Sequence, residues 1–169
     1  MKQLPMRLAA FLLAAGATGP APALAADASY TLRLMTPETA LKAALASLRS
    51  CRDAGFQVAV AVVDRAGQTQ VVLRDRYAGT HTTTAAVDKA WTAASFKSDT
   101  SQLAEATQAG KASSGIRDIP RVLAVGGGMM VEVAGNIYGA IGISGAPNGQ
   151  ADERCAKAGF DAISEDLEM

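Results

Sequence analysis

The sequence predicts an α/β (α+β) fold, a single domain in which an antiparallel sheet of about five strands is flanked by helices. Two pairs of apolar runs are each joined by a short turn, which is the pattern of β-hairpins. Amphipathic helical segments precede, separate and follow these hairpins. The length of 169 residues and the 49% hydrophobic content suit one domain with its own core. Because hairpin strands pair antiparallel, we expect the helices to cover the faces of one sheet.

Residues 1–25 have the pattern of a secretory signal peptide. A basic start is followed by an apolar run, residues 8–15, that is too short to span a bilayer, and Ala23-Leu24-Ala25 fits a cleavage site. Cleavage there, or one residue later, leaves residues 26–169 as the mature domain; a buried N-terminal helix is the alternative. We therefore expect a periplasmic or extracellular protein with no membrane insertion after processing.

The charge pattern gives no sign of a nucleic-acid partner. The chain has 16 basic and 16 acidic residues, and residues 1–25 hold two of the basic ones and no acid. The remainder therefore has 14 basic and 16 acidic residues, a net charge of −2. No basic patch with interleaved aromatic residues is present.

Cys51 and Cys155 are the two cysteines of the chain. An oxidising compartment permits a disulfide between them, which would close a long loop, and two buried thiols are the other interpretation. With two cysteines and one histidine, a structural zinc site is not expected.

The first helix is expected to begin at Thr36-Pro37, because threonine caps helices well and proline suits the first helical position. Leu41, Leu45 and Leu48 recur at helical spacing and should face the sheet. Gly55 should end the helix.

The first hairpin follows. Phe56–Val63 is a continuous apolar run, which indicates a buried central strand. Asp64–Gly67 is a turn and Gln68–Arg74 the return strand. Beyond a polar loop, Ala85–Phe96 should be a helix for which Thr82–Thr84 offer caps. A short helix starts at Ser98–Ser101, and Ala151–Leu167 is the closing helix.

The second hairpin is rich in glycine. Its first strand is expected to combine Val122–Val125 with Met129–Val133, and its second is Ile137–Ser144. Gly126–Gly128 interrupt the first strand, and further glycines punctuate the second. Such glycines mark bulges or the close approach of another group. Tight packing of a helix on the sheet and a surface for a flat ligand are equally compatible with this pattern.

Four segments resemble the GlcG/HbpS-type haem-binding proteins, the DUF336 family: VAVAVVDRAGQTQVVLR, DKAWTAASF, DIPRVLAVGGG and GAIGISGAPNGQADERCAKAG. The resemblance runs from about Leu34 to the C-terminus. It implies a profilin-like fold, assembly into a homo-oligomer and, for secreted members, haem binding, in some linked to redox sensing through a sensor kinase. In a profilin-like arrangement the terminal helices lie side by side, which would let Cys51 and Cys155 meet. The chain departs from the family pattern at Gly127–Met130, which lacks a proline, and at Arg74–Tyr77.

Three residues are candidates to approach a haem iron. His81, the single histidine, lies in a polar loop at a helix start, and a neutral imidazole there can bind iron; a surface histidine without a role is the alternative. Tyr77 is a phenolate candidate or a packing residue. Thr92 is a candidate through the family-like helix segment.

Five other residues could contact the porphyrin. Arg74, Arg76 and Lys89 are able to pair with propionates, or are solvated surface charges. Trp91 could stack on the ring, and Met129 could supply apolar contact, although either also suits a core position.

Enzyme signatures are mostly missing from the sequence. There is no phosphate-binding Walker loop and no zinc-protease motif, and Gly142–Ala146 lacks the last glycine of a nucleophile elbow. Nothing in the spacing favours a triad of His81, Ser144 and an aspartate. The sequence therefore predicts an exported haem-binding protein for scavenging, storage or redox sensing. The alternative is an enzyme or binder that acts on a small carboxylate metabolite in the groove of an oligomer.

Overall fold

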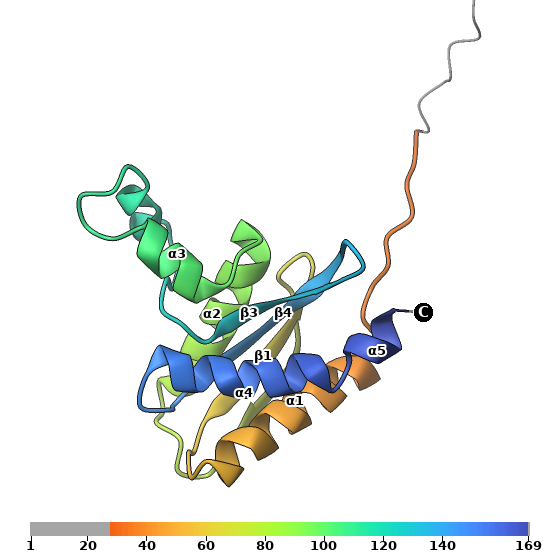
Figure 1. Ribbon diagram of the computed structural model, residues 1–169, viewed down its shortest axis with the longest axis horizontal. Coiled ribbons are helices and arrows are strands. Elements are labelled where there is room, and N and C mark those ends of the chain that lie inside the picture. Colours follow the sequence, from red (N-terminus) through yellow and green to blue (C-terminus); the bar gives the residue numbers. More distant parts are fainter. Residues whose placement is uncertain (1–27, 169) are drawn as a thin grey trace, which may run out of the picture. The chain divides into compact units, whose positions relative to one another are not determined.

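The computed structural model describes residues 28–168, of which residues 32–168 form one compact unit (Figure 1). The elements are α1 (Pro37–Asp53), β1 (Ala59–Asp64), β2 (Thr69–Arg74), α2 (Thr82–Phe96), α3 (Thr100–Ala106), the 3-10 helix η1 (Ser114–Asp118), β3 (Gly128–Val133), β4 (Asn136–Ser144), α4 (Gly149–Asp161) and α5 (Ser164–Leu167). The expected signal peptide lies outside the described residues and stays a prediction. Within 28–168, no helix combines the length and apolar character needed to cross a bilayer.

The sheet is antiparallel throughout, with the strand order β2-β1-β4-β3. The predicted antiparallel α+β fold is therefore confirmed, with four strands where about five were expected. The first strand of the second hairpin is also shorter than expected, because Val122–Val125 forms no strand and Gly127 has a left-handed φ of 116°. The turn of the second hairpin is Ala134-Gly135, with φ values of 48° and 75°, which suits a two-residue hairpin.

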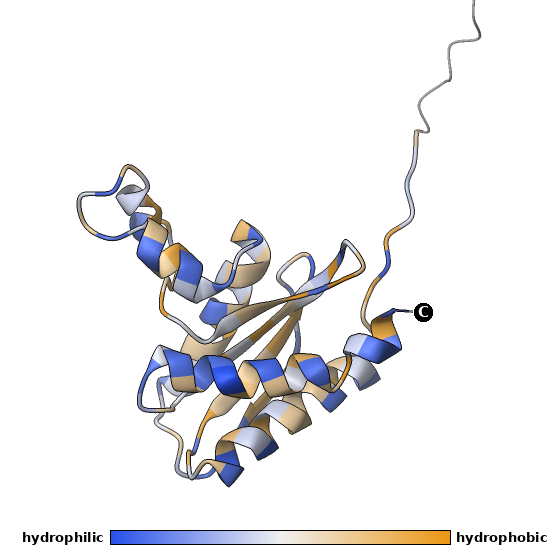
Figure 2. Cartoon of the chain, viewed as in Figure 1, coloured by the Kyte–Doolittle hydropathy of each residue, from blue (hydrophilic) through white to orange (hydrophobic). Residues whose placement is uncertain are grey.

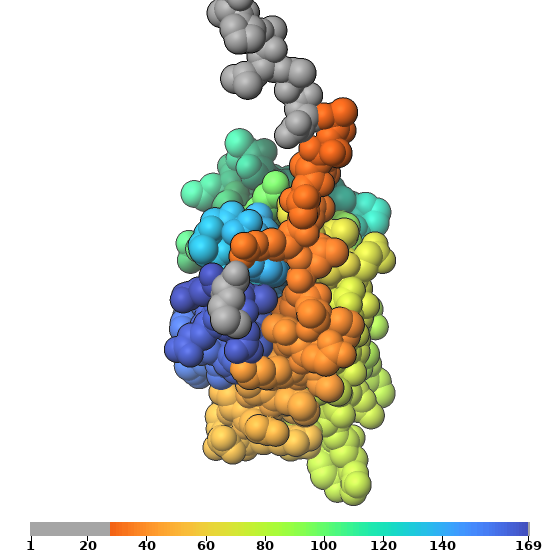
Figure 3. All heavy atoms as spheres, turned by 90° about the vertical axis from the view of Figure 1, so that its right-hand side faces the viewer, coloured from red at the N-terminus to blue at the C-terminus, as the bar shows by residue number. Residues whose placement is uncertain are grey.

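Helices cover both faces of the sheet (Figure 1). Helices α1 and α4 pack on one face and against each other, and α2 packs on the opposite face. The space-filling view shows α1 in orange and α4 in dark blue side by side (Figure 3). Cys51 on α1 and Cys155 on α4 form a disulfide with a Cα–Cα distance of 5.4 Å, which confirms that hypothesis.

Helix α1 turns a different side to the sheet from the one expected. Its cap is confirmed, since the side chain of Thr36 accepts a hydrogen bond from Thr39 N. However, Leu41 and Leu45 are 42% and 36% exposed. The buried side consists of small residues with one leucine: Ala40, Ala43, Ala44, Ser47, Leu48 and Cys51. The reason is the close approach of α4, because a Cβ on Gly159 would lie 2.1 Å from the hydroxyl oxygen of Ser47.

Between the sheet and α2 the packing is just as tight. The strands are apolar along their length in Figure 2, and the residues beneath α2 are mostly alanines of β1, α2 and β4. A Cβ on Gly142 would lie 2.0 Å from the carbonyl oxygen of Ala86, and one on Gly128 would lie 2.5 Å from that of Lys89. The backbone of α2 therefore fills the space above these glycines. The helix-packing interpretation is confirmed, and a flat ligand has no room there.

The start of α2 differs from the prediction in a way that matters for the site. The helix begins at Thr82 rather than Ala85, and no side chain caps it. The hydroxyl of Thr82 instead donates to the carbonyl oxygen of Gly79. No threonine side chain therefore accepts a hydrogen bond from the N–H groups in the first turn of α2.

Candidate functional site

A cavity of about 300 Å³ lies where the starts of α2 and α4 meet the end of β4. We call it the α2–α4 cavity. Its lining includes His81, Thr82, Lys89, Ser144, Gly149 and Asp152. Two of the predicted site residues, His81 and Lys89, thus lie in one cavity.

An ion pair between Lys89 and Asp152 forms part of the wall. Lys89 Nζ lies 2.8 Å from Asp152 Oδ2 and donates to the carbonyl oxygen of Ile143 at 3.0 Å. The two side chains are only 5% and 4% exposed. Gly127 makes room for the pair, because a Cβ there would lie 2.7 Å from Asp152 Cβ and 2.9 Å from Lys89 Nζ. Lys89 is therefore not a solvated surface charge.

Burial raises the pKa of Asp152 above its usual 3.8, and the nearby charge of Glu153 acts in the same direction. The hydrogen bond and the charge of Lys89, together with the bond from Ala146 N, oppose this rise in pKa. Both carboxylate oxygens of Asp152 thus have a donor, as expected of a buried charge that is retained in the fold.

His81 lies at the rim of this cavity. It precedes the first residue of α2 and is exposed. A Cβ on Gly79 would lie 2.8 Å from Cε1 and 3.0 Å from Nδ1 of the ring, so that edge of the imidazole faces Gly79. Within residues 28–168 the ring makes no hydrogen bond, which leaves it able to bind a ligand.

Ser144 ends β4 on the same side of the sheet. Its neighbour Ile143 belongs to the core beneath α1 and α4, and successive side chains of a strand point to opposite faces. The side chain of Ser144 therefore points toward α2, and it is 6% exposed. Its hydroxyl has no hydrogen-bond partner in the described part of the chain.

The structure thus brings His81, Ser144 and Asp152 to one cavity, a grouping that the sequence spacing did not favour. They do not form a catalytic triad. Asp152 is bonded to Lys89 and to Ala146 N, and none of the three side chains bonds another among the described residues. Among the described residues, Ser144 therefore has no hydrogen-bonded base of the kind that activates a nucleophile.

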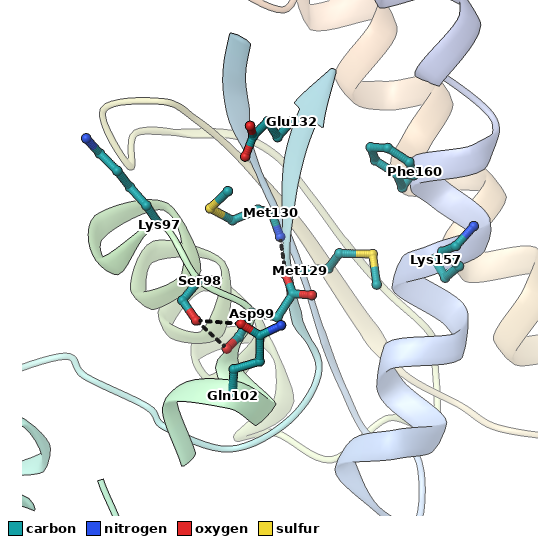
Figure 4. A pocket seen from close by; sticks show the side chains of 9 residues that line it. All are labelled: Lys97, Ser98, Asp99, Gln102, Met129, Met130, Glu132, Lys157 and Phe160. Carbon is teal, nitrogen blue, oxygen red and sulfur yellow. Dashed lines mark hydrogen bonds between the residues drawn. The ribbon is translucent and has the colours of Figure 1, made fainter. Parts of the chain in front are cut away.

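A second cavity, of about 290 Å³, lies beside the edge strand β3 (Figure 4). Met129 and Met130 point to opposite sides of this strand, Met129 toward α4 and Met130 toward α2. The predicted contact residue Met129 therefore lies apart from His81. Asp99 accepts a hydrogen bond from Met130 N at 2.8 Å, and burial raises its pKa above 3.8.

Three further candidates lie in the loop after β2. Arg74 donates to the carbonyl oxygen of Ala78, Arg76 is exposed, and Tyr77 is 78% exposed. Their neighbour Asp75 turns inward and pairs with Arg52 at 2.8 Å. This ion pair anchors the loop, but it brings none of the three candidates into the α2–α4 cavity.

The last two candidates lie further along α2. The ring of Trp91 packs against Gly67, and the guanidinium of Arg121 lies 4.7 Å from its centroid. Thr92 is buried and accepts a hydrogen bond from Leu123 N at 2.9 Å. Both residues hold α2 to neighbouring segments and do not line the cavity that contains His81.

Asp152 and the start of α4 are the parts of the site that sequence reasoning missed. The local signal was present, since Asn148 is a typical N-cap and its side chain accepts from Ala151 N at 2.9 Å. The ion pair from Asp152 to Lys89 spans 63 residues, and no sequence pattern predicts that contact.

No group of three or more histidine, cysteine, aspartate and glutamate side chains in residues 28–168 could hold a metal ion. A haem iron needs a single protein ligand, because the porphyrin supplies four nitrogens. One free imidazole therefore suffices for haem, whereas a bare metal ion would need several ligands.

Comparison with known proteins identifies the family of the chain. Residues 35–161 match the family described as haem-degrading protein HbpS-like. A double mutant of HbpS from Streptomyces reticuli is 37% identical, with a TM-score of 0.76 over 86% of this chain and 98% of that one. Protein ORFY of Klebsiella pneumoniae, a DUF336 protein, is 27% identical, with a TM-score of 0.79 over 83% and 97%. PduOC, crystallised as a haem complex, is 27% identical, with a TM-score of 0.73 over 78% and 96%.

The chain belongs to the HbpS-like family.

Proposed function

We propose that the chain is an exported haem-binding protein with His81 as the iron ligand, and that it serves haem scavenging, storage or redox sensing. For redox sensing the partner would be a sensor kinase. The observation that carries the proposal is the position of the single imidazole, which is exposed and unbonded among residues 28–168 at the rim of a cavity. The relative PduOC was crystallised with haem, and the family description names haem degradation.

The residues around His81 are compatible with haem. Cavities that enclose a small molecule usually measure about 300–1,000 Å³. At about 300 Å³ the α2–α4 cavity is at the lower limit, so one chain would enclose only part of a haem. An exposed imidazole at the rim is in a suitable place for an iron that lies outside the cavity.

Hemin titration tests the proposal. The parent protein should develop a Soret band, and His81→Ala should shift its maximum and weaken hemin binding. Thr84→Ala, which removes an exposed side chain from the same helical turn, is the matched control and should bind hemin as the parent does. An unchanged spectrum in His81→Ala would remove His81 from the site. The absence of a Soret band in the parent would reject the haem proposal. Bleaching of the band on addition of hydrogen peroxide would extend the proposal from binding to degradation.

Export is tested on the protein recovered from periplasm or medium. Its mass should correspond to a chain that starts near Ala26, as the pattern of residues 1–25 predicts. An intact Met1 on the exported protein would contradict cleavage.

We also propose that the chain forms a homodimer through the exposed side of α1. Leu41 and Leu45 border a cavity of about 390 Å³ whose rim also carries Glu38 and Arg49. Glu38 and Arg49 are eleven residues apart, about three helical turns, and therefore share one side of the helix. In an antiparallel pair of α1 helices, each Glu38 meets the Arg49 of the second copy; a parallel pair would bring like charges together.

Charge reversal tests this interface. In light scattering, Glu38→Arg and Arg49→Glu should each weaken the dimer, and the combination of both changes should restore it. Leu41→Glu with Leu45→Glu should give a monomer, whereas Ile119→Glu, at another exposed apolar residue, should not. A parent that is monomeric at micromolar concentration would reject the assembly.

A further inference from the structure

The α2–α4 cavity holds a polar group that an iron ligand alone does not explain. Ser144 is 94% buried, since 6% of its surface is exposed, yet its hydroxyl has no partner within the described residues. The oxygen itself is not sealed off, since the fully buried side-chain atoms without a partner among residues 28–168 belong to Ser47 and Glu153. The hydroxyl points toward a cavity, so a polar ligand there would satisfy it.

The start of α4 adds a second donor to the same cavity. This helix has 13 residues, so the positive end of its dipole lies at Gly149. The Asn148 side chain already accepts from Ala151 N, whereas the N–H of Gly149 has no acceptor in the part of the chain that the structure describes. A free N–H group at such a helix start favours an anion.

The charged pair in the wall leaves room for an anion as well. Asp152 is neutralised by Lys89, and both of its carboxylate oxygens are already bonded, to Lys89 Nζ and Ala146 N. Lys89 Nζ has three N–H groups and uses two of them, on Asp152 and on the carbonyl oxygen of Ile143. The cavity thus offers several donors, and Asp152, the carboxylate that lines it, is already paired. The charge of Glu153, which acts to raise the pKa of Asp152, lies outside the lining and opposes an anion there.

We propose that the α2–α4 cavity is a carboxylate subsite, in which Ser144 Oγ, Gly149 N and Lys89 Nζ donate to one carboxylate group. The carboxylate has two sources. One is a propionate of haem, and this part of the inference rests on the proposed function. The other is a free small carboxylate, which does not depend on haem binding.

The first experiment compares hemin with hemin dimethyl ester, in which both carboxylates are blocked. The parent protein should bind hemin more tightly than the ester, because only hemin supplies the anion. Ser144→Ala should weaken hemin binding about tenfold, as expected for one hydrogen bond to a charged group, and should leave the affinity for the ester unchanged.

Ser47→Ala is the matched control. Ser47 likewise has a hydroxyl without a partner among residues 28–168, but this hydroxyl is fully buried between α1 and α4 on the other side of the sheet. Its replacement should change neither affinity. Circular dichroism of both variants shows whether they fold as the parent does.

The second experiment adds sodium acetate or sodium propionate at constant ionic strength and measures the melting temperature against sodium chloride. Stabilisation of the parent but not of Ser144→Ala, without any hemin binding, supports the subsite for a free carboxylate and rejects the haem function. The same stabilisation with equal affinity for hemin and its ester leaves both standing but places haem elsewhere. Equal affinities for hemin and ester, together with no effect of acetate or propionate, overturn the subsite.

Discussion

The two faces of the sheet are built from different side chains. Beneath α1 and α4 lie valines and isoleucines of β1, β3 and β4, and a disulfide joins the two helices. Beneath α2 lie mostly alanines, and the polar residues Lys89, Thr82 and Thr92 are buried on this helix. The first face buries more apolar surface per residue, which is the main source of stability in a small domain.

The small residues beneath α2 bury less apolar area, but they let the helix lie closer to the sheet. Because Gly142 and Gly128 lie directly under its backbone, α2 approaches the sheet closely enough for Lys89 to reach the end of β4 and the start of α4. The polar groups of the α2–α4 cavity depend on this approach. One face is thus held by apolar burial and a disulfide, whereas the other buries a charged pair beside a cavity.

The largest effect is expected on the α1/α4 face, from Cys51→Ala with Cys155→Ala. The disulfide closes a loop with a sequence separation of 104 residues. In the chain-entropy description, its loss should lower the free energy of unfolding by about 4–5 kcal/mol. Urea denaturation of the variant and of the parent, without reductant, measures the loss. A change below about 1 kcal/mol would show that this face holds together without the covalent link.

On the α2 face, Lys89→Met should lower the free energy of unfolding by about 3–5 kcal/mol at neutral pH, because it leaves Asp152 buried and unpaired. The loss should shrink on acidification. Without Lys89, the pKa of Asp152 rises further in the folded state, and below the ordinary value of 3.8 the carboxyl is protonated in both states.

Lys42→Met is the matched control for that change. Lys42 pairs with Asp166 at 2.7 Å, but the two side chains are 52% and 47% exposed. Its loss should cost less than about 1 kcal/mol. Equal losses in the two variants would mean that the buried pair is no more important than a surface pair.

Gly142→Ala tests the closeness of α2 to the sheet. Its Cβ would lie 2.0 Å from the carbonyl oxygen of Ala86, so the helix must shift. Overpacking of this kind costs about 1–3 kcal/mol, and the shift should also weaken hemin binding. Gly115→Ala, where nothing lies within 4 Å of the added Cβ, should change neither quantity. Unchanged hemin affinity in Gly142→Ala would separate the cavity from the packing of α2.

Local chemistry made most of the fold predictable. The cap at Thr36, the turn at Gly67 and the two hairpins follow from residue types within a few positions, and all are present. The orientation of α1 was not predictable from its leucines. That orientation is decided by the contact with Gly159 of α4, which lies far away in the sequence.

The site was predictable only in part, for the same reason. The place of His81 at a helix start was predictable because its signal is local, and the structure has it directly before α2. Ser144 lacked support because its role depends on which face of β4 it occupies, and Asp152 was missed because its partner is distant. Met129 was wrongly grouped with His81, since the two residues line different cavities. Side chains of a strand alternate between the two faces of the sheet, and the sequence did not show which face Met129 occupies.

The smallest effect is expected at the edge of the sheet, from Asp99→Asn. Burial raises the pKa of Asp99 above 3.8, so the folded state holds its proton to higher pH than the unfolded state does. The stabilising effect of that proton is present below pH 3.8 and is lost as the pH rises through the raised value. Asparagine keeps an oxygen for Met130 N without a charge, so it should stabilise the protein at neutral pH by about 0.5 kcal/mol or less.

The advantage of Asp99→Asn should disappear below pH 3.8, where the parent carboxyl is protonated as well. Asp99→Ala separates charge from hydrogen bonding, because it removes both and leaves Met130 N without its acceptor at the exposed edge of β3. This variant should be less stable than the parent, by about 1 kcal/mol. Urea denaturation of the three proteins between pH 3 and pH 8 provides the comparison. If Asp99→Asn is as unstable as Asp99→Ala at neutral pH, the charge of Asp99, and not only its hydrogen bond to Met130 N, holds the edge strand.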